Sequence, residues 1–191
     1  LELAYEHHEP LEVHARPANG SFEPTVPAFA IHEVRTTLAF DRPTALTFGG
    51  YELGTHLTIS GIRRPASTSP PVGDFLRPSL VLDLQKPFGS SRLLFHTIAA
   101  GVFTGDSVPV QHLVYLGGPT SGPGYGFHEF VGRGGVSQRM EYRFLAPFLP
   151  IPLGRFGRAP GTTTLAPFPT AAWSDRPAPF QARDQAWGPP R

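Results

Sequence analysis

Glu141 stands between Arg139 and Arg143 in the segment 136–144, and this group has the clearest chemical potential in the chain. A carboxylate in that position could act as a general acid or base. Flanking guanidinium groups, however, hold a carboxylate in its ionised and weakly basic form. We therefore expect the three side chains to form a ladder of ion pairs and to take no part in catalysis.

Other signatures of catalysis and ligand binding are missing from the sequence. It has no G-x-S-x-G, P-loop or H-E-x-x-H motif, and no helical pattern follows the glycine-rich segment 117–126 to aim amides at a phosphate. The eight histidines show no ligand spacing, and the adjacent His7 and His8 would point to opposite faces of a strand. Cysteine is absent. We expect no catalytic residue, no metal site and no cofactor.

The composition argues against two further classes of protein. With a net charge of +1 and 16% charged residues, the chain has neither the basic footprint of a nucleic-acid-binding protein nor the make-up of a disordered polyelectrolyte. No apolar run reaches the length of about 18 residues that a transmembrane helix needs. The 23 prolines and 21 glycines are dense in 63–74 and 147–161, which we expect to be long loops.

The remaining pattern is that of β-strands. Polar and apolar residues alternate over 51–62, and more briefly over 32–40, 79–85 and 136–144, as in strands with two unlike faces. We expect Pro78 to be the first residue of its strand. Residues 86–90 should form the turn of a hairpin that 91–103 completes. The apolar run 108–116 is expected to be a further short strand. The sequence thus predicts an all-β fold, an antiparallel meander with long Pro/Gly-rich loops.

Alternation alone does not say what the two faces meet. In a soluble sandwich the apolar face meets a core and the polar face meets water. In a transmembrane barrel the apolar face meets lipid and the polar face a wet lumen. The two architectures differ in the direction of five side chains, which converge on a core in the first and point outward in the second. These are Leu53, Leu57, Ile59, Met140 and Tyr142.

Three motifs follow one another between residues 116 and 144: Leu116-Gly117-Gly118, then Gly122-Pro123-Gly124-Tyr125, then Met140-Glu141-Tyr142-Arg143-Phe144. Their order resembles the barrel domain of the Omp85 superfamily, also called bacterial surface antigen. In that family a strand ending in Leu-Gly-Gly leads through a loop with an Arg-Gly-aromatic motif to a strand like Val-Glu-Tyr-Arg-Phe. Pro123 stands where the family has its loop arginine, and Gly122 where it has an apolar residue.

The resemblance implies the C-terminal part of a transmembrane β-barrel in the bacterial outer membrane. The family role is to insert or translocate polypeptides without covalent chemistry, so the partners would be outer-membrane lipid and unfolded outer-membrane or secreted polypeptides, with no nucleic acid. The loop would fold back into the lumen, and three charged residues would line the lumen wall. The loop residues are Gly117, Gly118, Gly122, Pro123, Gly124 and Tyr125, and the lumen residues are Arg139, Glu141 and Arg143.

The expected organisation is a partial barrel domain over 1–173, in which 162–173 resembles the family's next strand, and an irregular Pro-rich tail over 174–191. The family's barrel has about sixteen strands, and at about ten residues per strand plus connections this chain supplies about half of them. Three alternatives stay open. The barrel could belong to a patatin-like phospholipase whose catalytic part lies elsewhere. The chain could be a soluble all-β binding module, or a non-native translation product with fortuitous strand patterning.

Overall fold

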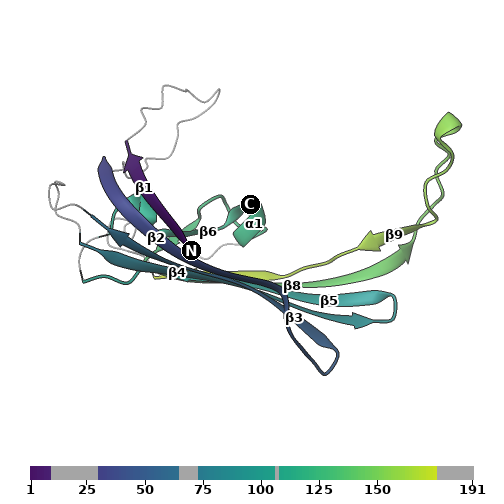
Figure 1. Cartoon of the computed structure of the whole chain (residues 1–191). Coiled ribbons are helices and arrows are strands. Elements are labelled where there is room, and N and C mark those ends of the chain that lie inside the picture. Colours follow the sequence, from purple (N-terminus) through teal and green to yellow (C-terminus); the bar gives the residue numbers. More distant parts are fainter. Residues whose placement is uncertain (10–29, 65–72, 106–107, 176–191) are drawn as a thin grey trace, which may run out of the picture.

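A single antiparallel sheet dominates the computed structural model, which describes residues 1–9, 30–64, 73–105 and 108–175 (Figure 1). Its strands follow the order β1-β2-β3-β4-β5-β8-β10, and β9 pairs with β8 on the same side as β10. The predicted all-β antiparallel meander is confirmed, and the sheet is open, with β1 at one edge and β9 and β10 at the other. The strands are β1 Glu2–His8, β2 Ile31–Phe48, β3 Tyr51–Arg63, β4 Phe75–Phe88, β5 Ser91–Gly101, β8 Gly134–Pro147, β9 Thr162–Leu165 and β10 Thr170–Ser174.

The prediction that Pro78 begins its strand is wrong, because β4 already begins at Phe75. Pro78 pairs with Ile59 of β3. On the other side of β4 the ladder with β5 ends at Ser79 and Ala100, and pairing resumes in a single bridge between Leu76 and Phe103. Proline has no N–H to donate to a neighbouring strand, which accounts for the gap in the ladder between β4 and β5. The strand tolerates Pro78 because only this one of its two ladders is interrupted.

The predicted hairpin is confirmed. Phe88 pairs with Ser91, and the connecting turn contains Gly89 at φ 58°, a left-handed conformation that glycine adopts without steric cost. The predicted strand over 162–173 is confirmed in two pieces, β9 and β10, which both run along β8. Between them the carbonyls of Pro167 and Pro169 accept hydrogen bonds from β8. The predicted tail lies outside the described residues from position 176 on.

Residues 108–133 leave the sheet, because β5 pairs directly with β8. We call 108–133 the infolded segment. It contains a 3-10 helix η1 (Val110–His112), β6 (Val114–Leu116), a single-turn helix α1 (Gly118–Ser121) and β7 (Phe130–Gly132). The apolar strand expected before the Leu-Gly-Gly motif is therefore shorter than predicted, and it pairs with β7 in a separate two-stranded sheet. Figure 1 shows β6 and α1 lying over one side of the large sheet.

We call the side of the sheet beneath the infolded segment its inner face. The buried apolar core lies there, where Val114 and Leu116 of β6 pack against Ile62, Phe75 and Val102 at one end of the large sheet. Fixing β6 over this end places the rest of the infolded segment above the polar side chains of β8. The infolded segment thus supplies one wall of the core.

The opposite, outer face of the sheet is apolar and uncovered. Register pairs place all five side chains that distinguish a sandwich from a barrel on this face, and none of them is in the buried core. Leu38 at 57% and Met140 at 39% illustrate how much of these side chains stays exposed. The main members of the outer face are Leu38, Phe40, Leu53, Leu57, Ile59, Leu80, Leu82, Leu84, Leu93, Phe95, Val136, Met140 and Tyr142.

Helices play a minor part in the described residues, and none is long and apolar enough to cross a membrane.

Candidate functional site

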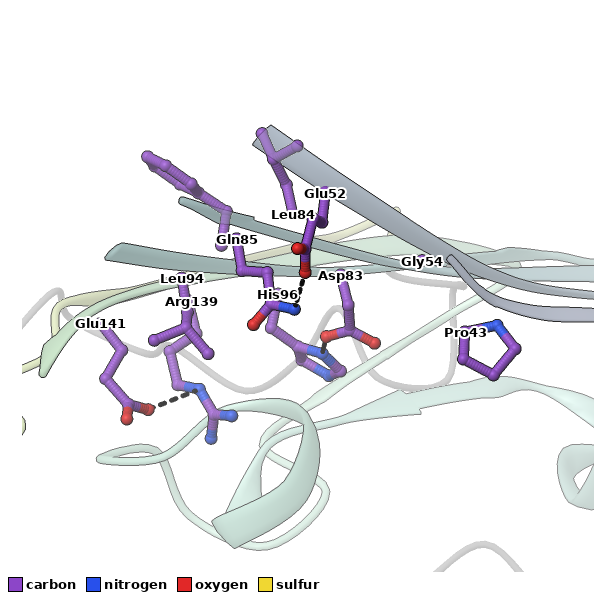
Figure 2. Close-up of a pocket in the computed structure, with 11 residues that line it drawn as sticks. Pro43, Glu52, Gly54, Asp83, Leu84, Gln85, Leu94, His96, Arg139 and Glu141 are labelled. Carbon is purple, nitrogen blue, oxygen red and sulfur yellow. Dashed lines mark hydrogen bonds and ion pairs between the residues drawn. The ribbon is translucent and has the colours of Figure 1, made fainter. Parts of the chain in front are cut away.

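The inner face carries a band of polar side chains that crosses four strands (Figure 2). Nε2 of Gln85 donates to Glu52 over 2.7 Å, and Arg92 donates to Gln85 over 3.2 Å. Next to them Nδ1 of His96 lies 2.6 Å from a carboxylate oxygen of Asp83. Cross-strand neighbours of opposite charge or matching hydrogen-bond capacity stabilise a sheet, so this band is a structural element as well as a hydrophilic surface.

The predicted lumen residues come together on β8. Nε of Arg143 donates to Glu141, and Nε of Arg139 lies 3.9 Å from the same carboxylate. The Glu141 side chain is 11% exposed, so it is held between the two cations and is nearly covered. Arg139 also pairs in register with His96, which joins the ladder of β8 to the Asp83–His96 pair. The expected ion-pair ladder is therefore present in the structure.

A shallow hollow of about 250 Å³ lies along this band. Figure 2 shows the side chains of Asp83, His96, Arg139 and Glu141 pointing from the sheet toward the same side. Charged side chains of both signs and the Gln85 amide line the hollow, and apolar side chains complete it: Pro43, Leu84, Leu94 and Phe95. Such a mixed lining can contact both the polar groups and the apolar side chains of an extended chain.

The loop motif begins with two glycines in backbone conformations that other residues rarely adopt. Gly117 has φ 117° and Gly118 has φ 74°, and between them they turn the chain from β6 into α1. The Ser121 hydroxyl closes this turn, because it accepts from the Gly117 N–H and donates to the Gly117 carbonyl over 3.0 and 2.9 Å. The turn is a compact, internally bonded structure.

The second half of the loop motif reaches the edge of the sheet. Tyr125 packs edge-on against Phe130, with 5.0 Å between ring centroids, and its hydroxyl lies 3.4 Å from the carbonyl oxygen of Thr170. Thr170 is the register partner of Arg139. Gly122, Pro123 and Gly124 form the turn that delivers Tyr125 there, with Gly124 at φ 95°. The structure thus places Tyr125 of the loop motif against β10, the strand that pairs with the ladder of β8.

Substitution of Gly117 by alanine is expected to disrupt this turn. A Cβ at this position collides with the carbonyl oxygen of Gly126, and the positive φ adds strain. We expect Gly117→Ala to destabilise the infolded segment by more than about 2 kcal/mol. Limited proteolysis within 117–130 would measure the effect. The matched control is Gly61→Ala, since a Cβ there has no atom within 4 Å; equal cleavage of the two variants would contradict the assigned role.

A buried ionic cluster fixes the other end of the infolded segment, and sequence reasoning missed it. Glu33 of β2 is fully buried on the inner face, and its two carboxylate oxygens lie 2.9 Å from Nε2 of His112 and 3.3 Å from Nε2 of His8. Because an ionised carboxylate only accepts, both imidazoles donate. The ring of His112 also packs on Phe75, at 4.8 Å between centroids. The contact between Glu33 and His112 therefore ties the infolded segment to the inner face.

Arg64, directly after β3, supplies positive charge to this cluster. Its Nε lies 3.9 Å from Glu33, and its guanidinium stacks over Phe75. Burial lowers the pKa of Arg64, while Glu33 and Asp74 act in the opposite direction. The three guanidinium nitrogens find no hydrogen-bond partner in the described part of the chain. Electrostatic attraction to Glu33 is then the main compensation for burying this cation.

Within the infolded segment, Tyr115 belongs to β6, away from the outer face. Its hydroxyl donates to the carbonyl of Val110 over 2.6 Å. Burial raises the pKa of Tyr115, so this hydroxyl remains a donor at neutral pH. Tyr115 is a packing residue of the infolded segment.

Comparison of the chain with protein-family models, with curated proteins and with solved structures gave no match. The argument for function therefore rests on the geometry of the two faces and of the infolded segment.

Proposed function

We propose that the chain forms the strands of an Omp85-type β-barrel in the bacterial outer membrane, where it takes part in inserting or translocating polypeptides. The observation that carries the proposal is the uncovered apolar face of a sheet whose other face is polar and holds an infolded segment. Soluble monomers rarely expose contiguous apolar patches of this kind. Lipid against the outer face accounts for its exposed apolar side chains, and water against the inner face accounts for its polar side chains.

The height of the apolar band supports this assignment. On β3 the outer-face positions run from Tyr51 to Gly61, a distance of about 33 Å at the usual rise of a strand. At the tilt of about 40° common in transmembrane barrels, this corresponds to about 25 Å across the membrane, the typical height of the apolar band. β3 is therefore of the right length to span the hydrocarbon layer.

Aromatic residues at the strand ends also favour a membrane setting. Where the β2–β3 and β4–β5 hairpins turn, Phe48 stacks on Tyr51 with 5.6 Å between centroids, and the Lys86 ammonium lies 4.4 Å from the centre of the Tyr51 ring. Phe88 of β4 and Tyr142 of β8 lie on the same face. Aromatic girdles of this kind mark the interface between hydrocarbon and water.

The infolded segment supports the more specific part of the proposal. The resemblance implies a loop that folds back against the inner wall and is fixed there by an ionic contact. In this chain Pro123 stands where the family has the arginine of that contact. The pair of Glu33 with His112 instead fixes the segment to the inner wall, from another position in the segment. In such a barrel the polar band would face the lumen, where an unfolded polypeptide passes, and no covalent step is required of it.

Extraction of membranes with urea tests the proposal directly. Cells would express the chain with its native upstream sequence, and isolated membranes would be washed with urea and run on gels with and without boiling. We expect retention in the outer-membrane fraction and a compact form that migrates differently after boiling. Release as a folded soluble protein would overturn the proposal and favour a soluble binding module.

A further inference from the structure

Three potential metal ligands from distant parts of the chain meet on the inner face. They are His8 of β1, Glu33 of β2 and His112 of η1, and one donor atom from each lies within 4.8 Å of the other two. Glu33 is fully buried and the His112 side chain is 7% exposed, while that of His8 is 34% exposed. The cluster is therefore enclosed on two sides and open on the side of His8, which gives an ion a path of entry.

The spacing of these atoms suits a small divalent ion. Zinc binds imidazole nitrogen and carboxylate oxygen at about 2.0–2.2 Å, so neighbouring ligands in a tetrahedral site lie about 3.3–3.5 Å apart. Oε1 of Glu33 lies 3.3 Å from Nε2 of His8, and Oε2 lies 2.9 Å from Nε2 of His112. With all three donor atoms within 4.8 Å of one another, rotation of these side chains can bring them to such distances around one ion. Two imidazoles and one carboxylate leave a fourth position for water.

The surroundings of the cluster are charged, and their signs balance. Glu6 lies 3.4 Å from Nε2 of His8 and pairs with Arg35, and Arg64 lies 3.9 Å from Glu33. Glu6 is thus within reach of the open position as a further oxygen ligand. Arg64 and Arg35 oppose a bound cation, whereas Glu33 and Glu6 attract it and lie closer to the ligand atoms of the cluster. A metal ion binds the deprotonated nitrogen of an imidazole. Ligation would therefore remove the Nε2 hydrogens that His8 and His112 donate to Glu33, and the ion would take their place.

We propose that His8, Glu33 and His112 form a binding site for a divalent transition-metal ion of the zinc class, which staples the infolded segment to β1 and β2. Hard ions such as Mg²⁺ are disfavoured because imidazole supplies two of the three ligands. The role of the ion is structural: three elements that are otherwise joined by hydrogen bonds become joined through one centre. The site is independent of the proposed membrane role, since it is defined by contacts on the inner face.

Titration of the full chain, folded in detergent and freed of metal by chelation, with Co²⁺ alone and then Zn²⁺ alone tests this site. We expect one equivalent of Co²⁺ to give the visible absorption of a tetrahedral complex and Zn²⁺ to displace it. In His8→Ala and His112→Ala the affinity for both ions should fall by at least about 10-fold. His96→Ala is the matched control, because it removes an inner-face histidine that also pairs with a carboxylate, and its affinity should equal that of the parent.

A second variant separates ligation from folding. His112→Gln keeps an N–H that can donate to Glu33, so the infolded segment should stay in place while the imidazole ligand is lost. We expect Zn²⁺ to slow proteolysis within 108–133 in the parent chain and in His96→Ala, but not in His112→Gln. Unchanged Co²⁺ affinity in His112→Gln and His8→Ala, or the absence of any stoichiometric binding by the parent, would overturn the proposal.

Discussion

Replacement of Leu57 by arginine is expected to block membrane insertion. Leu57 lies near the middle of β3 on the outer face, and its register partners Phe40 and Leu80 lie on the same face. An arginine at the middle of the lipid-facing surface costs about 2–4 kcal/mol in transmembrane barrels. Folding of the Leu57→Arg chain into lipid vesicles, measured from its resistance to urea and its mobility without boiling, should fall well below that of the parent.

The control for this substitution is the adjacent residue. His56 lies at the same depth of β3 but on the inner face, 3.6 Å from Asp41, which an arginine can equally well pair with. His56→Arg should therefore insert as the parent does. Equal insertion of Leu57→Arg and His56→Arg would show that the outer face does not meet hydrocarbon, and a soluble architecture would then be preferred.

Replacement of Glu33 by leucine is expected to release the infolded segment. The side chains are similar in size, but leucine leaves Arg64 buried without its nearest carboxylate and leaves His112 without an acceptor. Removing one partner of a buried ionic pair typically costs about 3–5 kcal/mol. Hydrogen exchange at the amides of Val114 and Leu116 should accelerate by the factor that corresponds to this loss of stability. The measurement is made with a chelator present, so that metal plays no part.

Glu52→Leu provides the comparison for Glu33→Leu. Glu52 also lies on the inner face and accepts a hydrogen bond, from Gln85 over 2.7 Å, but it is half-buried and this partner belongs to β4, outside the infolded segment. We expect this change to cost less than about 1 kcal/mol and to leave exchange in β6 unaltered. Similar exchange rates in the two variants would mean that Glu33 does not hold the segment.

Several features of the fold could be read from the sequence because they are local. The side-chain direction in a strand depends on odd and even positions alone, so the opposite faces of His56 and Leu57 follow from their adjacency. The turn around Gly89 is local in the same sense, since a left-handed residue between two alternating segments specifies a hairpin. The alternation over Glu2–His8 is of the same local kind, and this segment forms β1.

Other features depended on pairing between distant segments. The sequence alone suggested that Pro78 begins a strand, because the effect of its missing N–H is visible only when both neighbouring strands are in place. It also placed the residues before Leu116 in a longer strand. Direct pairing of β5 with β8 prevents this, because it leaves no position in the large sheet for the residues between them.

The sequence by itself determined the antiparallel strands, their two unlike faces and the ion-pair ladder of Arg139, Glu141 and Arg143, since strand geometry fixes all three within short segments. Tertiary structure decided the burial of Glu33 and its contact with His112, which is 79 residues away along the chain. In the sequence Glu33 is one polar position in an alternating strand, like many others. It becomes a buried anchor because the infolded segment covers it, and that coverage is set by which strands pair.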